Sequence, residues 1–239
     1  MKKYYILFLL FTTVYSIVLE EFTYSTKFKN IRVGNTKIDI LKEDKKTVLT
    51  FNSSTNKLID LIYKLRHFST VIVNDDNFSL VAITQKEQQG TYIDSYNARV
   101  DYKLKKIYYQ NTKDIKYDTQ KDQLIIPIDG LVYDPLSIVY YLRKFDIKVG
   151  KKYNFTLYNK KKIREIVLYV EKIENLRTPY LSADCFVVIP SSKGKEVLLK
   201  HQGEMKIWFT ADTNKIPIKI QQKMTHGIME LTLKNYVKK

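Results

Sequence analysis

The chain has 239 residues, a formal net charge of +16 at pH 7 and a single cysteine. An internal disulfide is therefore impossible, and a folded domain of this size must be stabilised by packing alone. The positive charge comes from 35 Lys and only 6 Arg scattered along the chain, whereas nucleic-acid readers rely strongly on Arg. We expect a solvated, lysine-rich surface and no nucleic-acid partner; attraction of that surface to anionic lipid or polysaccharide remains open.

The first 16 residues have the layout of a secretory signal peptide. Two lysines precede an apolar run from Tyr4 to Val14, and small residues lead to a predicted cleavage position after Ser16. The alternative is an uncleaved anchor, but the apolar stretch from Tyr4 to Leu19 has only 16 residues, and a spanning helix needs about 20. No cysteine stands at the cleavage position, so no lipoprotein is predicted. The remaining chain, residues 17–239, has no other stretch apolar enough to span a membrane.

The first half of that chain is predicted to form antiparallel strands. Apolar and polar side chains alternate, which indicates strands with one buried and one wet face, and turn-forming residues separate the runs. Residues 56–67 have near-helical spacing and predict a short helix or an irregular bend. The predicted strands are 21–34 with a turn near Gly34, 36–41, 47–52, 68–74, 78–85, 92–104 and 107–109, followed by a polar connection over 110–123.

The stretch DPLSIVYYLRKF, residues 134–145, departs from this alternation because its apolar residues fall near helical spacing. Asp134 is predicted to be the N-cap, and Pro135 the first helical residue, where its missing N–H costs nothing. One amphipathic helix between two blocks of strands is expected to plug an open end or cover a face of a rolled sheet. Whether it only completes the core or also lids a ligand cavity stays open at this point.

The second half returns to the strand pattern. Cys185 lies in an apolar run and is expected to be a buried small hydrophobe rather than a nucleophile. The predicted strands are 152–158, 163–173, 184–189, 195–202, 204–210, 215–222 and 228–237. Many short strands without a βαβ rhythm predict a mainly antiparallel all-β fold. We expect a large curved sheet or half-open β-barrel with one or two short helices, forming a single domain over 17–239; the alternative is two β halves, about 17–126 and 146–239, joined by the helix.

Two motifs carry a resemblance to a known family: DPLSIVYYLR at 134–143 and WFTADTNKIPIKI at 208–220. Further matching positions are Tyr24, Val33, Gly34, Gly150, Glu171 and Gly227. On these residues the chain resembles the domain-of-unknown-function family 3108, a set of exported, envelope-associated bacterial proteins. The resemblance covers nearly the whole chain after the signal peptide. It implies an envelope location and a β-rich fold, and it implies no established reaction.

No catalytic motif is found, and we predict a protein that is not an enzyme. The sequence contains no nucleophile elbow, P-loop, dinucleotide loop or paired CxxC. His201 and Glu204 have the spacing of a metal pair on a helix, but the alternation around them indicates strand and turn. We therefore expect neither a metal nor a cofactor, although carboxylate pairs that only folding brings together would escape a search of this kind.

Candidate ligand-binding residues are aromatic or charged side chains on the predicted inner surfaces. Tyrosines on one face suit an amphipathic ligand, because each offers an apolar body and a polar tip; they suit an ordinary core equally well. Arg143 on a mostly apolar helix is expected either to pair with a carboxylate such as Glu171 or Asp212, which we favour, or to hold an anionic head group. Asp212 beside Trp208 is a further candidate, with a plain turn as the favoured alternative. The candidates are Tyr92, Tyr96, Tyr102, Tyr140, Arg143, Trp208 and Asp212.

Two functions of different classes follow. The first is a periplasmic or envelope protein that binds or carries a lipid-like, amphipathic component in a β-barrel cavity. The second is a structural module that docks another envelope protein or an acidic polymer through its basic surface. Both predict a membrane-proximal protein that does not span the membrane, and we expect a monomer. An internal cavity of some hundreds of Å³ would distinguish the first from the second.

Overall fold

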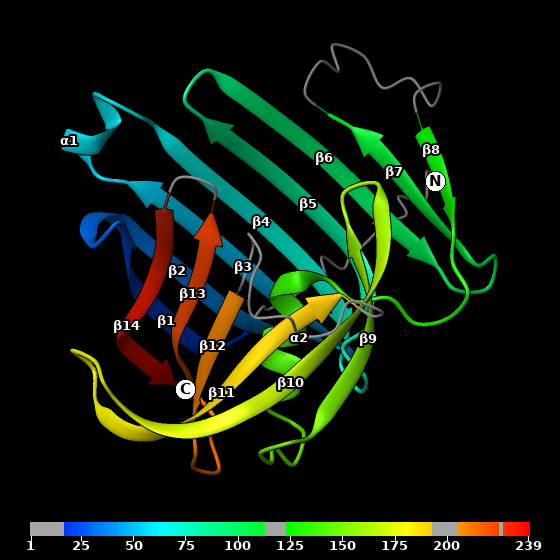
Figure 1. Ribbon diagram of the computed structural model, residues 1–239. Coiled ribbons are helices and arrows are strands. Elements are labelled where there is room, and N and C mark those ends of the chain that lie inside the picture. The colour runs from blue at the N-terminus through cyan, green and yellow to red at the C-terminus, as the bar shows by residue number, and fades with distance from the viewer. Residues whose placement is uncertain (1–16, 113–122, 193–204, 225–226) are drawn as a thin grey trace, which may run out of the picture.

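The structure is a computed structural model that describes residues 17–112, 123–192, 205–224 and 227–239. These residues form fourteen strands and two short helices, α1 (Lys57–Asp60) and α2 (Pro135–Leu142) (Figure 1). The strands are β1 (Ile17–Phe28), β2 (Ile31–Glu43), β3 (Lys46–Thr55), β4 (Leu65–Asn74), β5 (Leu80–Gln89), β6 (Tyr92–Asp101), β7 (Lys106–Asn111), β8 (Gln123–Pro127), β9 (Lys152–Asn159), β10 (Lys162–Arg177), β11 (Ser182–Ser192), β12 (Met205–Thr210), β13 (Pro217–Met224) and β14 (Gly227–Lys238). The predicted strand over 195–202 lies outside the described residues.

All these strands belong to one antiparallel sheet. Sequence neighbours pair with each other within β1–β8 and within β9–β14, and β1 pairs with β14 in the middle of the sheet. The sheet ends at β8 on one side and β9 on the other, so it is curved but not closed into a barrel. The predicted fold class, mainly antiparallel all-β with a large curved sheet and one or two short helices, is therefore confirmed.

The predicted turn near Gly34 is wrong. The chain turns earlier, at Lys29 and Asn30, which both have positive φ angles, and Gly34 lies inside β2 opposite Thr55 of β3. A Cβ atom on Gly34 would lie 2.0 Å from the carbonyl oxygen of Ser54. Glycine is thus required here by the close approach of a neighbouring backbone, one of the usual reasons for glycine in a strand.

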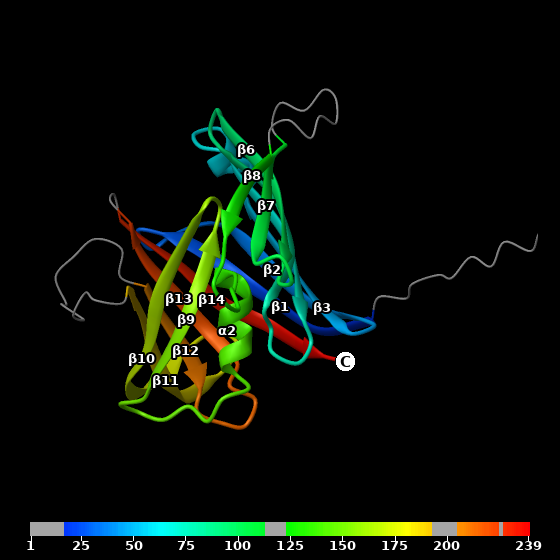
Figure 2. The ribbon, with the colours of Figure 1, turned by 90° about the vertical axis from the view of Figure 1, so that its right-hand side faces the viewer.

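The helix predicted over 134–145 is confirmed as α2, with Asp134 as its N-cap and Pro135 at its start. The Asp134 carboxylate accepts the N–H groups of Leu136 and Ser137 at 2.8 and 2.9 Å, and the Ser137 hydroxyl accepts the Asp134 N–H at 3.2 Å. This reciprocal capping satisfies helix-end donors that burial would otherwise leave unpaired. Figures 1 and 2 show α2 inside the curve of the sheet, between β9–β10 and β1–β3. We call this face of the sheet concave and the opposite face convex.

The helix packs into the hydrophobic core on two sides. Tyr140 lies against Phe22 of β1, with ring centroids 5.1 Å apart. Tyr141 stacks on Phe78 at 5.3 Å and on Tyr133 at 5.7 Å. The Tyr141 ring also contacts Phe155 of β9, with ring centroids 6.2 Å apart. Side-chain packing of α2 thus joins the two blocks of strands, in addition to the pairing of β1 with β14.

A short backbone segment before α2 links the first block of strands to the free edge of β9. The Leu80 N–H at the start of β5 donates to the Val132 carbonyl at 2.8 Å. Tyr133 donates its N–H to the Thr156 carbonyl at 2.9 Å and accepts the Tyr158 N–H at 2.8 Å, forming a parallel bridge to β9. Residues 132–133 thus satisfy part of the β9 edge, which would otherwise be open to pairing with other chains.

Candidate functional site

A row of polar side chains crosses the concave face over six strands. Residues directly opposite each other in a sheet share a face, and the strand registers align Tyr24, Thr36, Ser53, His67, Glu87 and Asp94 in this order. We call these six residues the polar row. At its β2–β3 part the hydroxyls of Thr36 and Ser53 are hydrogen-bonded at 2.8 Å. At its β5–β6 end it carries two carboxylates.

Both carboxylates contact one lysine from the other half of the chain. Lys160, in the turn between β9 and β10, places its Nζ 2.7 Å from Asp94 and 3.4 Å from Glu87. The Glu87 and Asp94 side chains are each only 13% exposed. The turn between β9 and β10 therefore crosses the concave face. Its Lys160 ammonium binds carboxylates of β5 and β6, two strands that lie far from it in the sequence.

The charges of this cluster do not balance. Burial lowers the pKa of His67, so His67 is neutral near pH 7. Glu87 and Asp94 then share the single positive charge of Lys160, and within the described chain no second cation lies within ion-pair distance of either carboxylate. The ammonium of Lys161 lies instead over the Tyr109 ring, 5.0 Å from its centroid. The cluster retains about one negative charge in a largely desolvated place, where such a charge is costly.

Tyrosines surround the carboxylate end of the polar row. Tyr96 stacks on Tyr109 with ring centroids 5.3 Å apart, and its hydroxyl donates to the Gln85 side chain at 3.3 Å. Tyr158 on β9 is 1% exposed, and its buried hydroxyl has no hydrogen-bond partner within the part of the chain that the structure describes. Burial raises the pKa of Tyr158 well above the usual value. A buried hydroxyl without a hydrogen-bond partner is costly, so a partner atom at this position would stabilise the structure.

The predicted tyrosines do not form one group. Tyr96 is the one in this cluster, whereas Tyr92 lies at the start of β6 and is exposed. The Tyr102 hydroxyl donates to the Leu80 and Val132 carbonyls at 2.9 and 3.3 Å, so it holds the segment that leads to β9. Tyr140 lies in the α2 core. Sequence reasoning missed Glu87, Asp94, Tyr158 and Lys160, although the hairpin register around Gly90 places Glu87 opposite Asp94.

Arg143 pairs with a carboxylate, as favoured, but both proposed partners are wrong. Its guanidinium binds Glu20 of β1 at 2.6 and 3.3 Å, and its Nε donates to the Asn214 carbonyl at 3.0 Å. Glu171 lies instead 3.9 Å from Lys206. The side chains of Arg143 and Glu20 are 12% and 16% exposed, so this bidentate pair is largely desolvated.

Trp208 and Asp212 do not face the concave side together. Alternation along β12 places Ile207 on the concave face and Trp208 on the convex one, where its indole N–H donates to Glu174 at 2.6 Å. The Asp212 carboxylate accepts the hydroxyl of Thr210 and the N–H groups of Asn214 and Lys215 at 2.6 to 3.1 Å. Asp212 is therefore a turn residue, which was the favoured interpretation.

A surface groove of about 180 Å³ lies beside the link to β9. It is lined by Leu131, Tyr133, Asn154, Phe155, Thr156, Glu165 and Ile166. Its volume is below the several hundred Å³ typical of small-molecule sites, and no predicted site residue lines it.

Two further findings concern metal-binding side chains and membrane-spanning helices. Among them, no three His, Cys, Asp or Glu side chains are grouped as a metal site, and the pair His201 and Glu204 lies outside them. Neither helix in the described ranges is long and apolar enough to cross a membrane.

Comparison with known proteins gives a family and a fold. A solved structure from Brucella abortus, a β-barrel-like protein of the domain of unknown function DUF1849, is similar over 95% of this chain and 100% of its own, with a TM-score of 0.60 and 9% identity. A putative lipoprotein from Parabacteroides distasonis aligns with 92% of this chain and 95% of its own, with a TM-score of only 0.31 and 8% identity. No protein with a curated description matches the sequence significantly. The family model for the protein of unknown function DUF3108 matches residues 23–234, and the chain therefore belongs to this family.

Proposed function

We propose that this is a non-enzymatic, exported protein of the bacterial cell envelope that binds an amphipathic, lipid-like molecule on the concave face of its sheet. The observation that carries the proposal is the uncompensated cluster at the end of the polar row. Glu87 and Asp94 share Lys160, and the unpaired hydroxyl of Tyr158 lies in the same part of the molecule. A bound molecule that supplies hydrogen-bond donors would satisfy these groups together.

The charged residues on the concave face predict the charge of the ligand's head group. Arg143, for which an anionic head group was the alternative to the favoured carboxylate pair, is already neutralised by Glu20. The concave cluster is negative, so it favours a cationic or donor-rich neutral head, such as an amine or several hydroxyls. The stacked rings of Tyr96 and Tyr109 offer an apolar surface to the rest of the ligand. The function is therefore binding, with Glu87 and Asp94 as acceptors rather than acids or bases.

Export rests on the predicted signal peptide, residues 1–16. The test is the N-terminal sequence of protein taken from separated cell fractions. Cleavage after Ser16 and recovery from the envelope or periplasm support the proposal, whereas recovery of uncleaved protein from the cytoplasm contradicts it.

Ligand binding is tested by native mass spectrometry and organic extraction of protein purified from its own envelope without detergent. We expect a defined amphipathic mass at near-unit stoichiometry, lost in the double variant Glu87→Gln/Asp94→Asn. The control is Glu230→Gln, because Glu230 pairs with Lys219 at 2.8 Å and is 18% exposed but lies on the convex face. Empty wild-type protein that co-purifies with another envelope component would contradict the carrier function and support the docking module.

A further inference from the structure

The segment between β3 and β4 presents apolar side chains to solvent. Leu58, Leu61 and Ile62 are 77%, 84% and 85% exposed, and no residue of α1 is buried. Isolated exposed leucines are common, but several adjacent apolar side chains indicate an interaction site. We call residues 56–64 the apolar tip.

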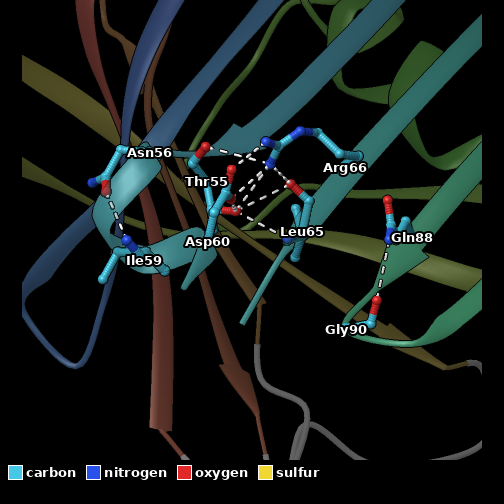
Figure 3. Close-up of polar contacts among 8 residues, drawn as sticks. All are labelled: Thr55, Asn56, Ile59, Asp60, Leu65, Arg66, Gln88 and Gly90. Atoms are coloured by element: carbon cyan, nitrogen blue, oxygen red, sulfur yellow. Dashed lines mark hydrogen bonds and ion pairs between the residues drawn. The ribbon is translucent and has the colours of Figure 1, made fainter. Parts of the chain in front are cut away.

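The apolar tip is held in place by a polar network at its base, which Figure 3 shows. Arg66 binds both carboxylate oxygens of Asp60, one at 2.9 Å, and the Thr55 hydroxyl donates to Asp60 at 2.5 Å. The charged partner and these hydrogen bonds lower the pKa of Asp60 to about 2, so the network persists over the physiological pH range. The exposed apolar side chains therefore project from a segment whose position is fixed by these contacts.

Local contacts fix the shape of the tip itself. The Asn56 side chain accepts the Ile59 N–H at 3.0 Å as an N-cap (Figure 3). The Tyr63 N–H donates to the Ile59 carbonyl at 2.8 Å. The Tyr63 ring lies over Gly90, where an added Cβ would be 3.4 Å away. Tyr63 thus joins the tip to the turn between β5 and β6.

The turns on the same rim of the sheet carry further exposed apolar residues. Because the strands are antiparallel, the β1–β2 turn, the β5–β6 turn, the end of β13 and the start of β14 lie on the same side as the apolar tip, where the strands end. The exposed residues at these positions are Ile31, Tyr92, Ile93, Met224 and Ile228. The apolar character therefore extends along the rim, with the tip as its most exposed point.

Positive charge accompanies these apolar residues. Lys29, Lys57, Lys64 and Lys223 are exposed on this rim, and in the described ranges none has a carboxylate within ion-pair distance. Of the acidic residues near the rim, Asp60 is paired with Arg66 and Glu230 with Lys219. Glu87 and Asp94, close to the β5–β6 turn, are only 13% exposed and share Lys160. The rim thus carries exposed apolar side chains next to lysines that, in the described ranges, have no carboxylate partner.

From the juxtaposition of Leu58, Leu61 and Ile62 with Lys57 and Lys64 on one ordered tip, we propose that this rim docks onto an anionic membrane surface. Exposed apolar side chains enter the boundary between head groups and acyl chains, while flanking lysines contact anionic lipid head groups. Lysines combined with projecting apolar side chains fit a bilayer surface better than a protein groove or an acidic polymer. A polar polymer has no apolar layer into which Leu58, Leu61 and Ile62 could insert. The apolar tip shares no residue with the polar row, so this proposal does not rest on the proposed ligand.

The test is vesicle flotation with residues 17–239, which contain every described strand and helix. We expect binding to vesicles of phosphatidylethanolamine with phosphatidylglycerol and much weaker binding to phosphatidylcholine vesicles. Leu61→Ser/Ile62→Ser should weaken binding at least about tenfold, and Lys57→Gln/Lys64→Gln should weaken it mainly at low salt. The matched control is Leu104→Ser/Val149→Ser, which changes exposed apolar residues at the opposite rim.

A tryptophan at the tip gives a second readout. The natural Trp208 is buried, so Leu61→Trp adds a reporter whose emission should shift to the blue and be quenched by brominated acyl chains. Equal binding of the tip variant and the control variant would overturn the proposal. So would a stable dimer that Leu61→Ser/Ile62→Ser dissociates in the absence of vesicle binding, because the rim would then bind a second copy of the chain.

Discussion

Replacing Arg143 by Met should destabilise the fold strongly, because it leaves Glu20 without its charge partner. The pair joins the end of α2 to β1 across 123 positions of sequence. Glu20 is 16% exposed, so little water reaches it to replace the guanidinium. The same substitution removes the hydrogen bond to the Asn214 carbonyl and the contact of the guanidinium with the Phe22 ring, 5.6 Å from its centroid.

The size of the effect follows from burial. Removing one partner of a buried ion pair costs about 3–5 kcal/mol, and the residual exposure of Glu20 places this pair near 3 kcal/mol. The double variant Glu20→Gln/Arg143→Met should recover much of that loss, because no uncompensated charge remains. The pair Lys148 and Asp146 provides the comparison: its 2.7 Å separation is almost the same, but its side chains are 70% and 65% exposed. Lys148→Met should leave stability unchanged within error.

The measurement is equilibrium unfolding in urea, followed by the fluorescence of Trp208, the only tryptophan, and by circular dichroism. The coupling between Glu20 and Arg143 is obtained from the double-mutant cycle. A loss below about 1 kcal/mol for Arg143→Met, or a double variant that loses the sum of the two single losses, would refute the argument from desolvation.

Three further predictions concern the helix cap, a strand contact and the cysteine. Burial raises the pKa of Asp134 to about 6, above about 3.9 in an unfolded chain, so the folded state binds the proton more tightly. This contribution to stability is complete below about pH 4 and is lost, by about 3 kcal/mol, as the pH rises through 6; Asp134→Asn, which keeps an N-cap acceptor, should flatten this part of a pH series of urea unfolding curves, and an unchanged slope would contradict the assignment. Gly34→Ala should cost about 1–3 kcal/mol in the same assay, because the new Cβ meets the Ser54 carbonyl oxygen; an unaffected unfolding midpoint would mean that β2 and β3 separate easily. Cys185 is 0% exposed and burial raises its pKa to about 11, so a thiol reagent should modify it only at the rate of unfolding, and rapid stoichiometric labelling of the native protein would be inconsistent with the packing.

Local patterns in the sequence predict most of the strands and the cap of α2. The alternation from Tyr92 onward identifies β6, because a strand with one buried face repeats every second residue. Asp134 and Pro135 identify the start of α2 through backbone chemistry that depends only on adjacent residues. The sequence does not predict β8, because its five residues are too short to show a period.

The candidate site was harder to predict because its residues come from distant segments. Arg143 was correctly expected to pair with a carboxylate, but Glu20 lies 123 positions away and no local rule selects it. Lys160 meets Glu87 and Asp94 only because the β9–β10 turn crosses the concave face. The facing of Glu87 and Asp94 themselves follows from hairpin register, so treating residues 86–91 as strand and turn would have revealed that pair.

The pairing of β1 with β14 has a consequence for the order in which the chain folds. A chain that emerges N-terminus first presents β1 long before its partner β14 becomes available, although β1 can pair with β2 at once. One edge of β1 therefore has no strand partner until almost the entire polypeptide has been made, and an open strand edge can pair with other chains. Loss of the C-terminal strand would leave β1 and β13 open permanently. Truncated or stalled chains of this protein are thus expected to depend on chaperones, because the last strand to be made completes the centre of the sheet rather than its margin.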